Sequence, residues 1–372
     1  MVDSNRNPRS AAIDAARGLA ASLVLIHHLD VLYPGAISGL LGEATIARKL
    51  VRGLSDMNPD AVMLFFVISG FCIRATSRKF DFSCARRVGD YALRRAARII
   101  PLYLFALGFT FLCGVAMRVE HTKPYTLATL VGNIFFLQTP DGTRGQWFVP
   151  YGANGPLWSI SYEVFYYAIF PAMALIEARL ISGRDRVAIL VRVLTALVVS
   201  LLGLISYNLI PNPIFLFLTL YFVWCLGARS EEVYHARMRP YGLIGLLAGL
   251  GVAMGIVIEL HASATLRLML SGTVIGIVWL FLQSHLLASR FANLWPCVAC
   301  IKPLAKLGGV SYGLYLIHYP TLSVCRFVFG DSTIGFTVAV IGSVALAYSA
   351  EIVGGHVKEV ILSRPVARET IM

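Results

Sequence analysis

The chain has 372 residues, of which 57% are hydrophobic and only 14% are charged. A soluble globular domain carries about 25% charged residues, so this composition excludes an ordinary soluble enzyme. The formal net charge is +12, but the basic residues alternate from loop to loop along the chain. That alternation is typical of a protein in a lipid bilayer, so we do not expect a nucleic-acid partner.

Apolar stretches close to the length of a bilayer span recur along the whole chain. They predict an all-α fold, a polytopic transmembrane bundle of about ten helices, with spans at 17–33, 61–77, 99–117, 157–176, 187–206, 214–227, 241–259, 268–286, 307–325 and 333–354. With a cytoplasmic N-terminus, 24 of the 32 Lys and Arg residues fall on the cytoplasmic side. This bias follows the positive-inside rule and predicts two cytoplasmic termini, as in a bacterial inner membrane.

No long linker or repeat interrupts the spans, so residues 1–372 are predicted to form a single membrane domain with no fused soluble domain. No small-residue cleavage site follows the first apolar stretch, which indicates a retained span and not a cleaved signal peptide. The seven cysteines are scattered, and Cys297 and Cys300 lack the second ligand pair of a zinc site. We therefore predict no disulfide framework and no metal site.

Arg17 and His28 lie eleven positions apart on the first predicted span. Eleven residues are close to three helical turns, so both side chains lie on nearly one face, about 16 Å apart along the axis. Ionisable groups inside a bilayer face protein or a water-filled cavity, which favours one polar track from Arg17 to His28. We expect the arginine to hold an anionic ligand and the histidine to act as a general base or an acyl carrier. His27 and Asp30 point to other faces of the helix.

Two further ionisable residues fall inside predicted spans. Glu163 lies near the outer end of the fourth span, where it is expected to orient an imidazole, bind a substrate hydroxyl or pair with a basic residue. His318 lies eleven residues into the ninth span, at a depth that matches His28 in the first span. The two imidazoles could therefore meet inside the bundle.

Two connections are unusual. The cytoplasmic connection at 74–98 holds eight Lys and Arg residues, and helical spacing makes Arg95 and Arg98 neighbours on its surface. Adjacent guanidinium groups suit phosphate oxygens, although contact with anionic lipid headgroups explains the cluster equally well. The outer connection at 118–156 is rich in Pro, Gly and aromatic residues, and an interfacial or re-entrant helix is expected within 125–137.

Taken together, several segments resemble acyltransferase family 3, the bacterial integral-membrane O-acyltransferases that act on nodulation factors, O-antigens and exopolysaccharides. In family order, the resemblance is carried by Ile13-Asp-Ala-Ala-Arg-Gly with His28, by Phe65-Phe-Val-Ile-Ser-Gly-Phe, by Arg95-Ala-Ala-Arg-Ile-Ile-Pro, by Leu157-Trp-Ser-Ile-Ser-Tyr-Glu and, more loosely, by Ser311-Tyr-Gly-Leu-Tyr-Leu-Ile-His. The chain departs from the family at Cys72, where Leu is usual, and at Val164, where a second Glu is common.

The resemblance implies an acyl-CoA donor, usually acetyl-CoA, which enters from the cytoplasm as a substrate and not as a permanently bound cofactor. It also implies a carbohydrate or glycolipid acceptor on the outer side, near Glu163. The phosphates of the donor are then expected to meet Arg17, Arg95 and Arg98.

The expected catalytic residues are His28, Glu163 and His318. The chain has no P-loop, no dinucleotide-binding glycine motif and no nucleophile-elbow motif, so phosphoryl transfer, nicotinamide chemistry and serine hydrolysis lose support. A proton-coupled transporter or flippase of a lipid-linked glycan stays open as an alternative, because intramembrane His, Asp and Glu residues also form proton relays.

Overall fold

The computed structural model describes residues 8–78, 80–181, 185–261, 264–286 and 298–363. Within these ranges the chain is helical, and its only β-type pairing is a single bridge between Gln138 and Phe148. Nine of the described segments are long and apolar enough to span a membrane. The prediction of an all-α, polytopic bundle is confirmed.

The nine segments contain α1 (Pro8–Leu32), α4 (Asn58–Ser77), α5 (Ala85–Ala116), α7 (Trp158–Leu180), α8 (Arg186–Leu209), α9 (Pro213–Thr219) joined to α10 (Tyr221–His235), α11 (Tyr241–His261), α12 (Ala264–Leu286) and α15 (Thr333–Ser363). The predicted ninth span, 307–325, corresponds to α14 (Ser311–Phe329), which is not among the nine. Polar side chains of α14, including Ser311 and His318, are buried against other helices.

Three regions differ from the prediction. The basic helix predicted within 74–98 and the span predicted at 99–117 form one continuous helix, α5. The sixth span continues past residue 227 to His235, because the charged residues in its last turns are paired inside the bundle. Two short helices, α2 (Pro34–Leu41) and α3 (Ile46–Asp56), follow the first span and were not predicted. The side chain of Thr45 caps α3 by accepting a hydrogen bond from the backbone N–H of Arg48.

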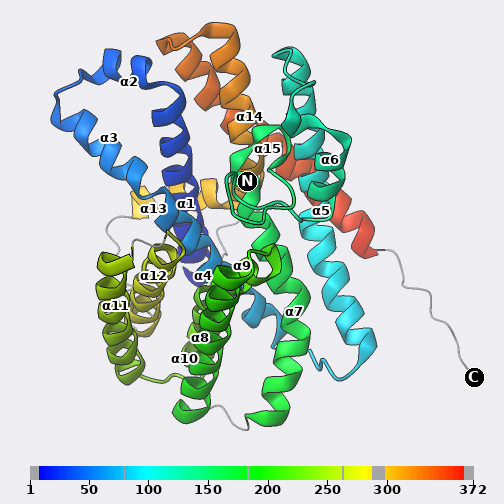
Figure 1. Cartoon of the computed structure of the whole chain (residues 1–372), viewed down its shortest axis with the longest axis vertical. Helices are drawn as coiled ribbons and strands as arrows, with labels where there is room; N and C mark the ends of the chain where they lie inside the picture. The colour runs from blue at the N-terminus through cyan, green and yellow to red at the C-terminus, as the bar shows by residue number, and fades with distance from the viewer. Residues whose placement is uncertain (1–7, 79, 182–184, 262–263, 287–297, 364–372) are drawn as a thin grey trace, which may run out of the picture.

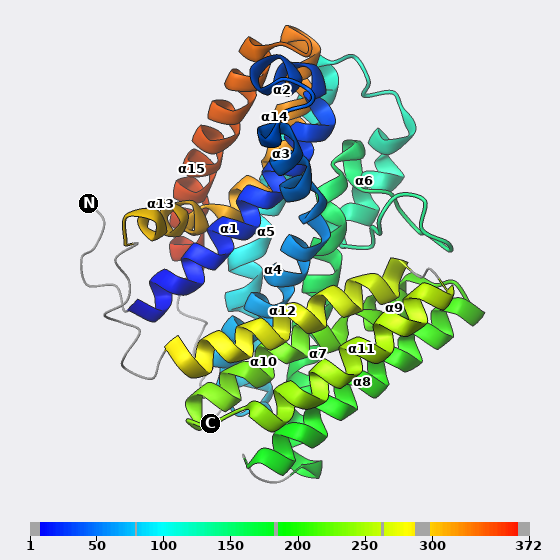
Figure 2. The same cartoon turned by 90° about the vertical axis from the view of Figure 1, so that its left-hand side faces the viewer.

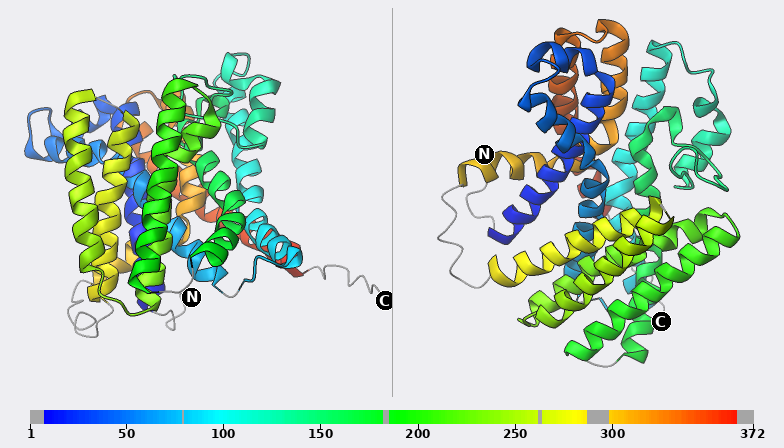
Figure 3. Two further views of the ribbon diagram at one scale, coloured as in Figure 1. Left: turned by 60° about the horizontal axis from the view of Figure 1, so that its bottom comes forward. Right: turned by 60° about the vertical axis from the view of Figure 1, so that its left-hand side comes forward.

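Helix α4 joins two groups of helices (Figures 1 and 2). One group contains α10 and α12, which pack on α4, with α8 and α11 outside them. The other contains α1, which packs on α4, on α13 (Val298–Gly309) and on α14, while α14 packs on α5 and α15. In the left-hand view of Figure 3, the yellow-green α11 and the yellow α12 stand side by side. The short α6 (Leu127–Ile134) lies in the outer connection, as predicted.

The contact between α4 and α10 depends on two glycines. A Cβ atom on Gly70 would lie 2.0 Å from the carbonyl oxygen of Trp224, and one on Gly227 would lie 1.9 Å from that of Val67. Small residues let helix backbones approach closely, which is a main source of helix association in lipid. The close approach also lets Nε1 of Trp224 donate a hydrogen bond to Oγ of Ser69, at 3.2 Å.

We predict that Gly70→Ala lowers stability by about 1–3 kcal/mol, because the added methyl group forces α4 and α10 apart. Thermal unfolding in detergent measures the effect. Gly108→Ala on α5 is the matched control, since a Cβ atom there meets no heavy atom within 4 Å. Equal melting temperatures for the two variants would contradict the close helix crossing.

Asp331, in the loop between α14 and α15, connects this loop to the start of α2. Its carboxylate accepts hydrogen bonds from the backbone N–H groups of Gly35 (2.7 Å) and Ala36 (2.9 Å) at the start of α2, and it pairs with Arg326 at 2.9 Å. Partial burial raises the pKa of Asp331, but the hydrogen bonds and the guanidinium of Arg326 outweigh burial. The pKa of Asp331 therefore lies below its ordinary value.

A lowered pKa in the folded state means that Asp331 stabilises the protein above the ordinary Asp pKa of about 3.9 and loses this effect as the pH falls through the folded value. We predict that Asp331→Asn lowers stability by about 1 kcal/mol at neutral pH. The difference from the parent protein should shrink as the pH falls from about 5 to about 3. Melting temperatures across that range test this prediction, with the exposed Asp56→Asn as control; a difference that does not change with pH would refute it.

Candidate active site

An open cavity of about 160 Å³ lies between α1, α4, α5, α7 and α14. We call it the arginine cavity, and its lining includes Arg17, Ser69, Arg95, Arg98, Glu163 and Tyr315. The fold thus brings Glu163 to the three arginines that were predicted to bind a donor.

The three arginines of the cavity keep much of their hydrogen-bonding capacity. Arg17 has no hydrogen bond or ion pair with any residue that the structure describes. Arg95 donates from Nη2 to Oγ1 of Thr76 at 2.6 Å, and its buried Nε has no partner among the described atoms. Arg98 reaches Glu351 only at 3.4 Å. Guanidinium groups with free N–H donors around one cavity favour a ligand that carries several negative charges.

Glu163 faces the cavity from α7. Its Oε1 accepts hydrogen bonds from Oγ of Ser69, at 2.9 Å, and from the hydroxyl of Tyr167. Ser69 is itself held by Nε1 of Trp224 at 3.2 Å. No described residue bonds to Oε2 of Glu163, so one carboxylate oxygen is available to a ligand in the cavity.

Glu163 lies in the second turn of α7, and the structure brings it into one cavity with the three arginines, which the sequence did not predict. The segment before α7 is folded into the bundle, where Asn154 is fully buried and donates from Nδ2 to the carbonyl oxygen of Leu316 at 2.9 Å. Gln138, also fully buried, donates to the carbonyl oxygen of Leu157 at 2.9 Å. Because this segment enters the bundle before α7 begins, Glu163 reaches the arginine cavity.

His28 and His318 meet, as their matching depths suggested. Nε2 of His318 lies 3.2 Å from Nδ1 of His28, and their ring centroids are 4.9 Å apart. His318 is 1% exposed, so this contact is shielded from bulk water. We call the two residues the imidazole pair.

The hydrogen-bond partners of the imidazole pair define which nitrogens carry protons when both rings are neutral. Carbonyl oxygens only accept, so Nδ1 of His318 donates to the carbonyl oxygen of Leu314 at 2.9 Å. Its Nε2 must then accept from Nδ1–H of His28, which also points at the carbonyl oxygen of Val24, 2.9 Å away. Nε2 of His28 is therefore unprotonated, and no described residue bonds to it.

The neighbouring polar residues of α1 turn elsewhere, as the helix-face argument predicted. Nδ1 of His27 lies 3.1 Å from the carbonyl oxygen and 3.2 Å from the hydroxyl of Ser55 in α3. Asp30 forms an ion pair with Arg48, which also lies in α3. These contacts attach α3 to α1 and leave His28 as the residue that faces His318.

The predicted continuous track from Arg17 to His28 is interrupted. Neither His28 nor His318 lines the arginine cavity. Tyr315 lines it, and its ring also packs beside that of His318, with ring centroids 6.1 Å apart. Tyr315 of α14 is therefore adjacent both to the cavity and to the imidazole pair.

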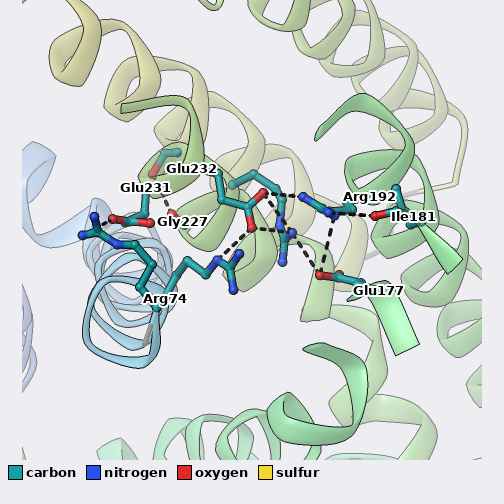
Figure 4. A network of polar contacts seen from close by, with 10 residues as sticks. Arg74, Glu177, Ile181, Arg192, Gly227, Glu231 and Glu232 are labelled. Atoms are coloured by element: carbon teal, nitrogen blue, oxygen red, sulfur yellow. Dashed lines mark hydrogen bonds and ion pairs between the residues drawn. The ribbon is translucent and has the colours of Figure 1, made fainter. Parts of the chain in front are cut away.

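A second polar centre, which the sequence did not reveal, lies between α4, α7, α8 and α10 (Figure 4). The carboxylate of Glu232 lies 2.8 Å from Arg74, 3.2 Å from Arg192 and 3.0 Å from Arg229. Glu177 lies 3.1 Å from Arg229. We call these five residues the Glu232 network. Since its arginines are all opposed by carboxylates, the network joins four helices and is not an open anion site.

The Glu232 network was missed because its arginines were counted as loop charges that orient the chain. Charged residues at 229–232 interrupt an apolar stretch, and such an interruption usually ends a span. The carboxyl group of Glu177 near the end of the fourth span was the available signal. Its partners lie on other helices, so sequence spacing could not identify them.

We predict that Glu232→Gln destabilises the protein by about 3–5 kcal/mol, because it leaves buried guanidinium groups with too few carboxylates. The melting temperature in detergent measures this loss. Glu359→Gln, on an exposed position of α15, is the matched control and should melt like the parent protein. A parent-like melting temperature for Glu232→Gln would mean that water, and not Glu232, compensates these arginines.

Comparison with known proteins agrees with the motifs described above. The family model of acyltransferase family 3, described as an acyltransferase domain, matches residues 10–352. The peptidoglycan O-acetyltransferase OatA of Listeria monocytogenes is 22% identical over 339 residues, which cover 84% of this chain and 49% of that protein. The chain thus spans about half the length of this curated relative. No solved structure matches the chain.

Proposed function

Because the chain belongs to acyltransferase family 3, we propose that it is an integral-membrane O-acyltransferase. It moves an acetyl or other short acyl group from acyl-CoA to a hydroxyl of a cell-surface or exported carbohydrate. The observation that supports this most is the arginine cavity, where Arg17 has no described partner. The bundle acts in a bacterial inner membrane with both termini of this chain in the cytoplasm, in agreement with its positive-inside charge bias.

The donor enters the arginine cavity from the cytoplasm. Coenzyme A carries its phosphates at one end and its thioester at the end of a long, thin arm. Arg17, Arg95 and Arg98 bind the phosphates, since guanidinium groups pair with phosphate oxygens through two parallel hydrogen bonds. The arm then points along α1 toward His28, about 16 Å away by helix rise.

His28 is the general base of the transfer. Its Nε2 takes the proton of the acceptor hydroxyl while the hydroxyl oxygen attacks the thioester carbonyl. The tetrahedral intermediate expels the CoA thiolate, which recovers the proton from His28, so an ester and free CoA are formed. A transient acyl-imidazole on the same nitrogen is the alternative route, in which His28 acts as acyl carrier.

Glu163 and His318 serve this reaction in different ways. His318 is a positioning residue, because its Nε2 accepts from Nδ1–H of His28 and thereby keeps Nε2 of His28 free to accept a proton. The same hydrogen bond stabilises the imidazolium that forms. Glu163 binds a hydroxyl or amide group of a substrate through Oε2, while Ser69 and Tyr167 hold its other oxygen. We assign it no role in orienting an imidazole, since no histidine that the structure describes is bonded to it.

The acceptor approaches the imidazole pair from the outer side, away from the arginine cavity. A carbohydrate or glycolipid hydroxyl supplies the nucleophile. The relative from Listeria is named for its action on peptidoglycan, a cell-surface glycan, which supports a carbohydrate acceptor for this chain. Donor and acceptor therefore use opposite ends of the same bundle.

We predict that His28→Ala lowers acyl transfer by roughly 10²-fold or more, since it removes the base. Arg17→Ala should raise the KM for acyl-CoA roughly tenfold with a smaller change in kcat, because it removes a charged contact to the donor. Membranes that contain the protein are supplied with labelled acetyl-CoA and purified surface glycan, and labelled acceptor is measured.

Two variants serve as controls. His27→Ala changes an adjacent imidazole that faces Ser55, and Arg144→Ala removes an exposed arginine in the outer connection; both should retain most of the activity. Transfer that is unchanged in His28→Ala would rule out the proposed base. A parent protein that never labels a glycan would refute the proposed enzyme and favour the transporter alternative.

A further inference from the structure

We propose that Tyr315, held by Ser159, is a partition between the arginine cavity and the imidazole pair that decides whether the acyl group goes to the acceptor or to water. The proposal rests on the function proposed above. Tyr315 and Ser159 lie within two of the segments that resemble the family, but neither has been given a role above.

Tyr315 occupies the position that such a partition requires. It lines the arginine cavity, and its ring also lies beside that of His318 on the same face of α14. Its ring packs edge-on against Phe65 of α4 with centroids 5.7 Å apart. Its hydroxyl forms a 2.7 Å hydrogen bond with Oγ of Ser159 at the start of α7. Three helices therefore hold one ring between the two halves of the site.

The hydroxyl contact is the specific restraint on this ring. Tyr315 is 6% exposed and Ser159 is 5% exposed, so bulk water does not compete freely for their hydrogen bond. The other ring contacts are non-directional packing against Phe65 and His318. A single neutral hydrogen bond is weak enough to break when the thioester arm arrives.

The partition matters because a thioester that can reach His28 can also be hydrolysed there. Water activated by Nε2 of His28 would attack the thioester carbonyl and release a carboxylate, free CoA and a proton. With Tyr315 in place, water in the arginine cavity is separated from the imidazole pair. If the Tyr315 ring moves only when the donor arm is present, the arm fills the passage and excludes water from His28. The acceptor hydroxyl is then the nucleophile that His28 activates.

The test compares Tyr315→Phe, Ser159→Ala and the double variant. Each single change removes the hydrogen bond between Tyr315 and Ser159 but keeps the aromatic ring of residue 315. Each should therefore raise the ratio of acyl-CoA hydrolysis to acyl transfer by roughly two- to tenfold. The double variant should show no further increase, because both changes remove one shared interaction.

Tyr166→Phe is the matched control. Its hydroxyl also donates a buried hydrogen bond, to the carbonyl oxygen of Phe217 at 2.9 Å, but Tyr166 does not line the arginine cavity. A loss of packing alone would change this variant in the same way as Tyr315→Phe. The control should keep the hydrolysis ratio of the parent protein.

A second measurement does not depend on enzyme activity. Diethyl pyrocarbonate added on the side where the arginine cavity opens modifies unprotonated imidazole, and mass spectrometry quantifies the modification of His28. Faster modification in Tyr315→Phe and Ser159→Ala than in Tyr166→Phe supports the partition. Equal rates, or equal hydrolysis ratios in an active enzyme, would overturn it. A parent protein without transfer activity would refute only the proposed function, because the labelling result still decides the role of Tyr315.

Discussion

Charge inside the bilayer is the constraint on which the rest of this structure depends. A guanidinium group within the hydrocarbon layer costs several kcal/mol unless a partner from another helix, a ligand or water compensates it. The bundle meets this requirement in two ways. In the Glu232 network each arginine is opposed by carboxylates, and four helices are joined as a result. In the arginine cavity the described carboxylates do not compensate all of the guanidinium charges, and a polyanionic substrate is suited to pair with the remaining ones.

The two polar centres share helix α4, which presents them on different faces. Ser69 faces the arginine cavity, where it supports Glu163, whereas Arg74 faces α10 and meets Glu232. The close crossing at Gly70 and Gly227 sets how near α10 comes to this helix. Since that crossing also places Trp224 against Ser69, helix packing and the geometry of the site are not independent.

The motif residues, their sequence order and the depth of the two histidines were available from the sequence. Arg17 and His28 lie on one predicted span, and matching distances into two spans that start on one side suggested that His28 and His318 meet, which the 3.2 Å contact confirms. The burial of Asn154 could not be predicted, and neither could the cavity that Glu163 shares with the arginines. A polar, proline-rich connection is ordinarily external, and its burial depends on partners such as Leu316 that are distant in sequence.

By itself the sequence determined the kind of protein: hydrophobic run lengths required a helical membrane bundle, the loop charges indicated its orientation, and ordered motifs indicated the family. Only the tertiary structure decided which arginines meet carboxylates: Arg229 pairs with Glu177 and Glu232, whereas no described residue pairs with Arg17. It also decided that Tyr315 is adjacent both to the arginine cavity and to the imidazole pair. A helix repeat defines the face of a residue on its own helix, but what lies opposite depends on how separate helices pack.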